Sequence, residues 1–347
     1  MGKGVVFAGP KMVEFETYDD VALGPGELRV RTLYSGISAG TEMTAYRGSN
    51  PYISKQWDAK TRLFLASAAP SQPYPLSGWG YEEVGEVIEV SPDVTALKVG
   101  DIVYGTWGHR THHILSEEYA SQRIKPNGLD PILAIYSHLG PIALNGILDA
   151  NIHVGETVAV FGLGVLGQVI VQLAKLNGAR VFGVDRIEKR LQLAKELGSI
   201  EDGFNSQDHS PAERIKALTN GRGADVTIEV TGSARALHEA VRATAYSARV
   251  VAMGFFQGEA QGLLLGEEFH HNRIQIICSQ ISNVDPALSY RWDRIRLIHT
   301  IMDLQAKGSL HLRPLITHFI PFEQAAQGFQ ILDETPDQAL QVVLDFS

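Results

Sequence analysis

The sequence of 347 residues contains a single cysteine, Cys278. One cysteine excludes both a disulfide framework within the chain and a cysteine-rich zinc site, and it fits a reducing compartment. There is also no run of about 18 consecutive apolar residues, the length that predicts a membrane-spanning helix. Residues 1–10 lack the apolar stretch of a signal peptide. We therefore expect a cytoplasmic protein, in which Cys278 is a small buried residue of a strand.

Basic residues are neither abundant nor clustered. The chain has 30 Lys and Arg against 39 Asp and Glu, which gives a formal net charge of −9. Proteins that bind nucleic acids or anionic membranes carry basic patches, so we expect neither partner. Hydrophobic residues make up 44% of the chain, which is ordinary for a globular protein and enough for two domains at this length. A small-molecule substrate is the partner that remains.

The first 130 residues read as short strands between turns. Residues 27–35, 81–90 and 101–104 have β-branched and polar residues at strand-like spacing. Residues 48–78 carry four prolines and one tryptophan, and a second tryptophan follows directly at Trp79; this composition predicts a long irregular loop of the kind that often borders a site. Trp57, Trp79 and Trp107 in this half could suit a bulky, ring-containing substrate.

From residue 157 the chain alternates apolar strands with helical segments. The strands are expected at 157–161, 180–184, 225–230, 249–253 and 274–278, and the helices at 165–176, 188–197 and 234–243. This alternation predicts a doubly wound parallel sheet with helices on both faces. After residue 290, a helix at 294–306, another at 322–332 and a final strand in residues 339–346 are expected to return to the first domain.

A glycine-rich turn follows the first of these strands and opens the helix at 165–176. In this G-x-G-x-x-G context the first glycine permits a tight turn, the second lets the backbone approach a pyrophosphate, and the third lets helix and strand pack closely. Asp185 ends the next strand, where a carboxylate accepts ribose hydroxyls and repels the 2′-phosphate of NADP. We therefore expect NAD, although Arg186 and Arg190 lie nearby. The predicted cofactor-binding residues are Gly162, Leu163, Gly164, Val165, Leu166, Gly167, Asp185, Arg186, Arg190, Thr231 and Gly254.

The stretch SGISAGTE at 35–42 has two readings. It contains G-x-S-x-G, the nucleophile elbow of serine hydrolases, but an elbow needs a long helix directly after the serine. Here TEMTAYRGSNP follows, with a glycine and a proline close behind. A neighbouring domain with a dinucleotide motif favours the second reading, in which this stretch belongs to a hydride-transferring enzyme.

Several stretches, in order, resemble medium-chain dehydrogenases/reductases, the zinc alcohol dehydrogenase superfamily, over nearly the whole chain. SGISAGTE resembles the family's G-I-C-G-T-D-like loop, GYEEVGEV (80–87) its G-H-E-x-x-G-x-V, and LKVGDIV (97–103) its K-x-G-D-x-V strand. GLGVLG, GADVTIEVTG (223–232) and PLITHFIPFEQAAQGFQIL (314–332) resemble later segments. The serine-containing loop resembles a branch that includes bacteriochlorophyllide dehydrogenase. The resemblance implies a β-rich GroES-like catalytic domain, a Rossmann domain, an active site between them, and a homodimer or homotetramer joined through strand 274–280.

The chain departs from the family at its zinc ligands. The resemblance places Ser38 or Ala39 at the first cysteine, Tyr81 at the histidine and His138 near the second cysteine, and the four-cysteine lobe of the structural zinc is missing. Hydroxyl and phenol groups are poor zinc ligands, so no metal is expected at this site. The alternative is a rebuilt site that uses His138 and Glu82, with His109 as a further ligand.

Without zinc, other groups must polarise the substrate oxygen and move its proton. The candidates are Tyr81 as a phenol acid, His138 as acid or base, Thr41 as the family's relay hydroxyl, Glu82 as its neighbouring glutamate, and His109 facing the site. Both His138 and Tyr81 also have a structural interpretation. His138 could be a hydrogen-bonded residue without a catalytic role, and Tyr81 could fill the space that zinc leaves.

We therefore expect a catalytic domain at 1–139, a NAD-binding domain at 140–289 and a return to the first domain at 290–347. The predicted function is NAD-dependent hydride transfer between nicotinamide and a secondary alcohol or ketone, without the usual zinc sites. One alternative is a zinc-free NAD(P)H reductase of activated C=C bonds or quinones, and another is a dinucleotide-binding protein without catalysis.

Overall fold

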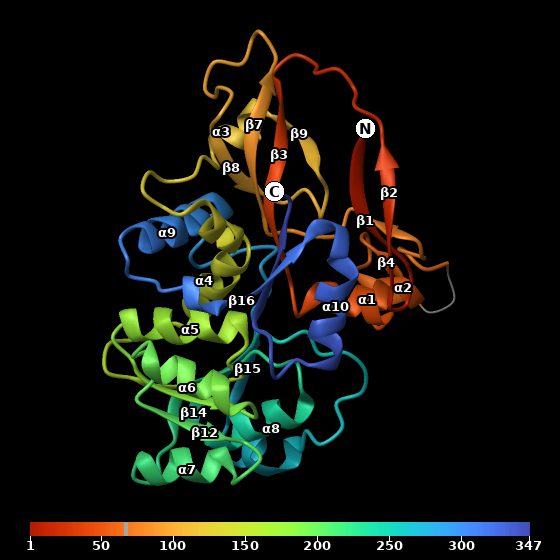
Figure 1. Cartoon of the computed structure of the whole chain (residues 1–347). Helices are drawn as coiled ribbons and strands as arrows, with labels where there is room; N and C mark the ends of the chain where they lie inside the picture. The colour runs from red at the N-terminus through yellow and green to blue at the C-terminus, as the bar shows by residue number, and fades with distance from the viewer. Residues whose placement is uncertain (66–68) are drawn as a thin grey trace. The chain divides into compact units, whose positions relative to one another are not determined.

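The protein is described by a computed structural model that covers residues 1–65 and 69–347 (Figure 1). The chain forms two compact units. Unit 1 comprises residues 1–138 and 313–347, and unit 2 comprises residues 139–312. Both halves of the expected fold class are present, because unit 2 contains a parallel sheet and unit 1 is rich in antiparallel strands.

Unit 2 is built on one six-stranded sheet whose strands run parallel. The strand order is β12-β11-β10-β13-β14-β15, which is the doubly wound order with its switch point between β10 and β13. The strands are β10 (Thr157–Phe161), β11 (Arg180–Asp185), β12 (Asp202–Asn205), β13 (Ala224–Glu229), β14 (Thr244–Ala252) and β15 (Gln275–Cys278). β10 and β13, the central strands, are buried along their whole length, as strands covered on both faces must be.

Helices cover both sides of these strands (Figure 1). α5 and α6 lie on one side, and α7 and α8 lie on the other, where they share an apolar cluster with Phe161, Phe182 and Val250. Ser233 begins α8, because its side chain accepts the N–H of Ala236. The helices of unit 2 are α4 (Leu139–Ala150), α5 (Val165–Leu176), α6 (Glu188–Glu196), α7 (Pro211–Leu218), α8 (Ala234–Ala243) and α9 (Arg294–Ala306).

Residues 290–312 belong to unit 2, whereas the sequence placed them with the returning segment. Gly140 of α4 shows why, because a side chain there would lie 2.4 Å from Cγ2 of Ile301 in α9. After α9, the N–H of His311 donates to Oε1 of Gln172 in α5 at 2.8 Å. The helix therefore packs on α4, and the return to unit 1 begins at Arg313.

Unit 1 is assembled around a six-stranded sheet that joins the two ends of the chain. The order is β16-β17-β3-β7-β8, with β9 paired to β3. These strands are β3 (Glu27–Ile37), β7 (Glu83–Val90), β8 (Ile102–Gly105), β9 (His112–Ser116), β16 (Ile316–Pro321) and β17 (Gln341–Asp345). Val343 of β17 lies opposite Gly36 of β3, so the last strand of the chain borders the strand that leads into SGISAGTE.

A second, three-stranded sheet and several helices complete unit 1. The sheet has the order β2-β1-β6, from β1 (Gly2–Gly9), β2 (Met12–Tyr18) and β6 (Leu76–Ser77). The helices are α1 (Thr41–Arg47), α2 (Pro51–Ser54), α3 (Glu117–Ser121), α10 (Ala325–Glu334) and the 3-10 turn at Pro131–Ser137.

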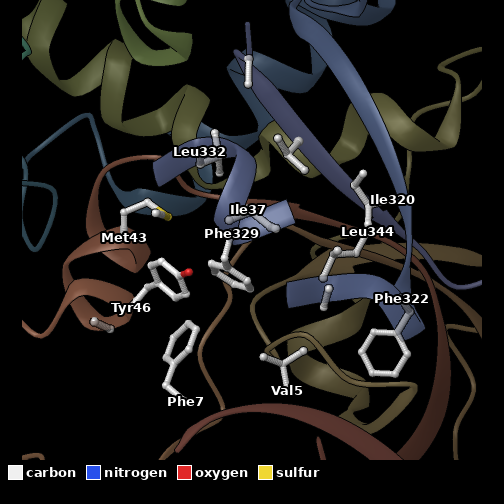
Figure 2. Packing of buried hydrophobic residues seen from close by; sticks show 14 of the residues in the cluster. Val5, Phe7, Ile37, Met43, Tyr46, Ile320, Phe322, Phe329, Leu332 and Leu344 are labelled. Atoms are coloured by element: carbon white, nitrogen blue, oxygen red, sulfur yellow. The ribbon is translucent and has the colours of Figure 1, made fainter. Parts of the chain in front are cut away.

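The core of unit 1 lies between α1, α10 and the strands (Figure 2). Phe329 of α10 packs edge-on against Phe7, with ring centroids 5.0 Å apart, and stacks on Tyr46 of α1 at 5.6 Å. Burying aromatic rings of this size contributes strongly to stability. This cluster anchors α1, the helix that follows Ser38.

Two sequence-based expectations on particular segments differ from the structure. The segment at 48–78 is not simply a loop, because it contains α2, β6 and a hairpin of β4 (Gln56–Asp58) and β5 (Leu63–Leu65), although residues 66–68 lie outside the described part. Trp107, which the sequence suggested as a possible contact for a bulky substrate, is a buried core residue. Cys278 is exposed rather than buried, because β15 is the edge strand of its sheet.

Among the described residues, no single helix is long and apolar enough to cross a membrane. One bent pair, Pro131–Ser137 with Leu139–Ala150, passes by length and composition. Most of its side chains are buried in the protein.

Candidate active site and cofactor site

Tyr81, Ser38 and His138 come together in unit 1. Ser38 lies between the end of β3 and the start of α1, Tyr81 directly precedes Glu82 and β7, and His138 follows the 3-10 turn at 131–137. The Tyr81 hydroxyl donates to Ser38 Oγ. The rings of Tyr81 and His138 lie 4.4 Å apart between centroids, inclined at 45°. These are the positions that the resemblance assigns to zinc ligands.

The Tyr81 phenol holds its proton firmly. Burial raises the pKa of Tyr81 well above its ordinary value, and the nearby carboxylates of Glu42 and Glu82 raise it further, against hydrogen bonds from Ser38 and Thr41. Thr41 is the first residue of α1 and is exposed. The Tyr81 group therefore remains a hydrogen-bond donor, and in this structure its single proton is directed at Ser38 Oγ.

A chain of four buried polar side chains lies behind Ser38. Glu42 Oε1 accepts the backbone N–H of Ser38 at 3.0 Å, and Glu42 Oε2 lies 2.5 Å from His109 Nε2. His109 Nδ1 lies 2.7 Å from Ser35 Oγ, which donates to Glu83 Oε1 at 3.0 Å. Because Ser35 Oγ donates its single proton to Glu83, its lone pairs are available to accept from Nδ1 of His109.

The pKa directions agree with a charged imidazole in this chain. Burial opposes the charge on His109, but Glu42 and Glu83 together raise the pKa of its ring above the ordinary value. Burial raises the pKa of Glu83 to about 7, against the lowering effects of His109 and of the Trp107 N–H, which donates to Glu83 Oε2 at 2.8 Å. The carboxylates of Glu42 and Glu83 thus favour the charged form of His109, and the contacts of Glu42, His109, Ser35 and Glu83 link them in one buried network.

Glu82 is fully buried and points away from these partners. A side chain on Gly36 would meet its Oε2 at 2.4 Å, and neither carboxylate oxygen has a hydrogen-bond partner among the described residues. Burial, with the charges of Glu42 and Glu83, raises the pKa of Glu82 well above its usual range. Burial without a hydrogen-bond partner thus favours the neutral form of this carboxyl group.

Sequence reasoning named Tyr81, His138 and Thr41, and the structure gathers all three. His109, which was expected to face the site, is buried instead, and Glu82, expected as the family's glutamate beside the zinc position, is fully buried. Sequence reasoning missed Ser35, Glu42 and Glu83. Glu42 stands in the quoted G-T-E stretch, yet only the fold shows that α1 turns this residue inward.

The donor set does not fit a zinc site of the family type. The one thiol is on β15, and Ser38 and Tyr81 are hydrogen-bonded to each other. In residues 1–65 and 69–347, one group of three His, Cys, Asp or Glu side chains has ligand atoms within 4.8 Å of one another, and it is His238 with Glu267 and Glu268. His138, Glu82 and His109 do not form such a group. Glu268 also accepts from Arg242 at 3.2 Å, which supplies a cation already.

The predicted cofactor residues gather at the switch point of the parallel sheet in unit 2. Gly162 follows β10 with φ of 101°, and a side chain there would lie 2.6 Å from Thr231, which follows β13. A side chain on Gly167 would lie 1.9 Å from the carbonyl oxygen of Gly162. In contrast, a Cβ on Gly164 at the start of α5 meets nothing nearer than 3.8 Å, which leaves room for a ligand at the helix N-terminus.

Asp185 lies at the carboxyl end of β11 beside this loop. Its Oδ2 accepts the Leu163 N–H at 2.7 Å and its Oδ1 accepts the Ile187 N–H at 2.8 Å. Arg190 is 3.9 Å from Oδ2, and Arg186 is exposed. These bonds fix the carboxylate while leaving further lone pairs, so the set of residues fits an adenosine ribose.

The neighbouring strand ends are held by a buried glutamate. Glu229 accepts the N–H groups of Thr231 at 2.7 Å and Gly232 at 3.2 Å. A side chain on Gly254 would lie 2.1 Å from the Gly232 nitrogen. Thr231 and Gly254 therefore lie together at the ends of β13 and β14.

Comparison with known proteins gives consistent results. The family model described as zinc-binding dehydrogenase matches residues 165–295. D-guloside 3-dehydrogenases of Escherichia coli (strain K12) and Shigella flexneri are 31% identical, over 99% of this chain and 100% of theirs. This chain belongs to the zinc-binding dehydrogenase family. It is an oxidoreductase of the medium-chain alcohol dehydrogenase type, and its relatives support hydride transfer on alcohols. The bacteriochlorophyllide dehydrogenase-like branch stays a prediction.

Solved structures of zinc-binding dehydrogenases and alcohol dehydrogenases share the fold. The 2R,3R-butanediol dehydrogenase of Bacillus subtilis is 20% identical and covers all of both chains, with a TM-score of 0.79. An Escherichia coli CFT073 alcohol dehydrogenase complexed with NADH is 21% identical, with a TM-score of 0.78 and 99% of each chain covered. A family member of Sinorhizobium meliloti 1021 bound to NADP is 19% identical, with the same TM-score and coverage.

Proposed function

We propose that this family member is an NAD-dependent dehydrogenase that oxidises a secondary hydroxyl of a sugar or polyol derivative, without zinc. The observation that carries the proposal is the group of Tyr81, Ser38 and His138, which stands at the family's zinc-ligand positions and offers proton donors and acceptors instead of metal ligands. The full-length relatedness to D-guloside 3-dehydrogenases supports the substrate class.

Asp185 supports NAD as the cofactor. Its carboxylate is fixed by two backbone N–H groups at the loop where the adenosine ribose binds in this fold. A 2′-phosphate would bring negative charge onto this carboxylate. Arg190 lies 3.9 Å away and partly offsets that repulsion, so the preference for NAD over NADP is expected to be finite.

The residues of unit 1 supply the proton chemistry. The glycine loop before α5 and Asp185 would hold NAD, which would supply C4 of its nicotinamide as the hydride acceptor. When the substrate binds, the Tyr81 hydroxyl turns its single proton from Ser38 Oγ to the substrate oxygen, where the new hydrogen bond stabilises the negative charge that develops. His138, against the Tyr81 ring, takes the hydroxyl proton as a general base. Thr41, exposed beside Tyr81, passes a proton to water. Glu82, which is fully buried, makes no contact with substrate.

The two alternative functions differ from a dehydrogenase in cofactor preference and in turnover. A reductase of quinones or activated C=C bonds would use the same dinucleotide site but prefer NADPH, and a binding protein would show no turnover. No contact in either unit favours one of them over a dehydrogenase of alcohols. The three functions are separable in one set of assays.

The test is NAD-dependent turnover by protein purified without a metal-affinity tag. Polyols and glycosides with a free secondary hydroxyl are offered with NAD and NADP, before and after dialysis against a strong chelator, and metal content is measured by plasma mass spectrometry. We expect NADH formation with NAD preferred, with near-zero zinc and unchanged kcat after chelation.

Each other outcome has a defined meaning. Activity that disappears with the chelator and returns with zinc would show that the site was rebuilt as a metal centre. Faster reduction of quinones by NADPH than oxidation of any alcohol would favour the reductase. NAD binding without turnover on any substrate would favour the binding protein.

A further inference from the structure

The buried side chains behind Ser38 have no role in the hydride and proton steps proposed above. We propose that the Glu42–His109 pair is a positioning device, which holds the Ser38 loop and thereby fixes the position of the Tyr81 hydroxyl oxygen. This inference rests on the proposed function, because it assigns a role to residues that act through Tyr81.

The first link runs from the pair to the active-site loop. Glu42 uses one oxygen for each partner, Oε1 for the Ser38 N–H at 3.0 Å and Oε2 for His109 Nε2 at 2.5 Å. Ser38 in turn accepts the Tyr81 hydroxyl through Oγ. A shift of the Glu42 carboxylate therefore moves the atom to which Tyr81 is hydrogen-bonded.

The second link fixes the imidazole itself. His109 is held at Nδ1 by Ser35 Oγ at 2.7 Å, and Ser35 is held by Glu83, whose other oxygen accepts the Trp107 N–H. The Phe329 ring packs edge-on against the imidazole at 5.8 Å between centroids. Glu42 and Ser35 thus contact the two ring nitrogens of His109, and Phe329 packs against its ring. These three contacts fix the orientation in which Nε2 meets the Glu42 carboxylate.

Two other readings of these side chains are weaker. Ser35, His109 and Glu42 have the residue types of a serine-hydrolase triad, but all three are at most 2% exposed and no acyl substrate can reach Ser35. A purely structural ion pair is the second reading. It would stabilise unit 1 equally whether or not Tyr81 has its hydroxyl, and this difference makes the two roles separable.

The experiment is a double-mutant cycle on Glu42 and Tyr81. Glu42→Gln keeps the shape of the side chain but can no longer accept from both Ser38 and His109. A small displacement of a reacting group costs up to about a hundredfold in rate. We therefore expect Glu42→Gln to lower kcat by about ten- to a hundredfold with KM for NAD unchanged, and to have little further effect in a Tyr81→Phe background.

A second readout does not depend on turnover. Hydrogen–deuterium exchange, resolved to the Ser38 amide, should be faster in Glu42→Gln because that N–H loses its carboxylate acceptor. Arg47→Gln is the matched control: Arg47 is the last residue of α1 and pairs with Asp333 at 2.6 Å, outside the network. It should leave Ser38 exchange and kcat unchanged. Ser35→Ala, which removes the Nδ1 partner of His109, replaces Glu42→Gln if that variant does not fold.

The outcomes distinguish this proposal from the proposed function. Equal losses of kcat from Glu42→Gln in the presence and absence of the Tyr81 hydroxyl would overturn positioning and leave a structural ion pair. Unchanged Ser38 exchange would overturn it as well. Full activity of Tyr81→Phe alone would instead overturn the assignment of Tyr81, and the Ser38 exchange would still decide whether Glu42 holds the loop.

Discussion

At the scale of single residues, Tyr81 presents a neutral phenol where a zinc enzyme would present a dication. A metal ion stabilises an alkoxide by full charge, whereas a phenol can offer one hydrogen bond. That hydrogen bond stabilises the alkoxide more strongly in a site that excludes water, because an unpaired charge there is costly in free energy. Burial and the neighbouring carboxylates raise the pKa of Tyr81, so the phenol stays protonated and remains a donor.

Replacing Tyr81 with phenylalanine tests this role directly. Tyr81→Phe removes the donor but keeps the ring that packs against His138 at 4.4 Å. We expect kcat to fall by about a hundredfold or more, the range of a single acid–base or oxyanion group, with NAD affinity unchanged. Steady-state kinetics and NADH fluorescence titration measure the two quantities. His138→Ala is the companion variant, and unchanged turnover in both would show that the catalytic residues are elsewhere.

The predictable and the unpredictable site residues differ in a physical sense. Gly162, Gly167 and Asp185 can be recognised from the neighbouring sequence. A tight turn, a close approach of helix and strand, and the end of a strand each require a particular residue type within a few positions. Glu42 and Glu83 gain their role from partners 67 and 24 positions away in the chain. No spacing rule in the sequence contains that information, and only the packing of α1 against the sheet supplies it.

At the scale of elements, periodicity located the helices well and the strands less well. α5, α8 and α9 begin and end at the predicted residues, since each is a helix of ten or more residues with one apolar face. β12 was not predicted from its sequence DGFN, because its conformation depends on parallel pairing with β11. The hairpin of β4 and β5 was likewise hidden in the proline-rich segment, since strand pairing is not a local property.

The glycine loop before α5 allows a prediction that separates binding from folding. In Gly167→Ala the new Cβ would lie 1.9 Å from the Gly162 oxygen, so helix and strand must move apart. Overpacking of this kind costs about 1–3 kcal/mol, and we expect a lower melting temperature together with weaker NAD binding. Thermal unfolding and NAD titration on the same sample measure both.

Gly164→Ala is the matched comparison within the same loop. Its backbone is extended with φ of −62°, and the new Cβ would make only an ordinary van der Waals contact with Arg190 Nη1 at 3.8 Å, so the melting temperature should not change. A methyl group at the helix N-terminus would still obstruct the pyrophosphate, and NAD affinity should fall about tenfold or more. Equal affinity in wild type and Gly164→Ala would contradict the proposed position of the cofactor.

At the scale of the whole molecule, the chain builds two units with separate apolar cores. Unit 1 contains strands from both ends of the chain, because β17 pairs with β3. The apolar run of the last strand, which is buried almost along its whole length, fits this place beside β3, and the sequence predicted the return of this segment to the first domain. The assignment of α9 to unit 2 could not be anticipated, since its apolar face does not identify α4 as its partner.

The edge strand β15 provides the last prediction. It pairs with β14 on one side, and no strand in the described ranges pairs with it on the other. Unpaired edges of this kind are normally covered, and two copies of β15 can pair across a two-fold axis. Light scattering should therefore give twice the mass of one chain, with slow amide exchange at residues 275–278. Cys278 is exposed there, so Cys278→Ser must keep the same mass if backbone pairing, rather than a disulfide, joins the copies. A monomer at micromolar concentration, with fast exchange along β15, would contradict the prediction.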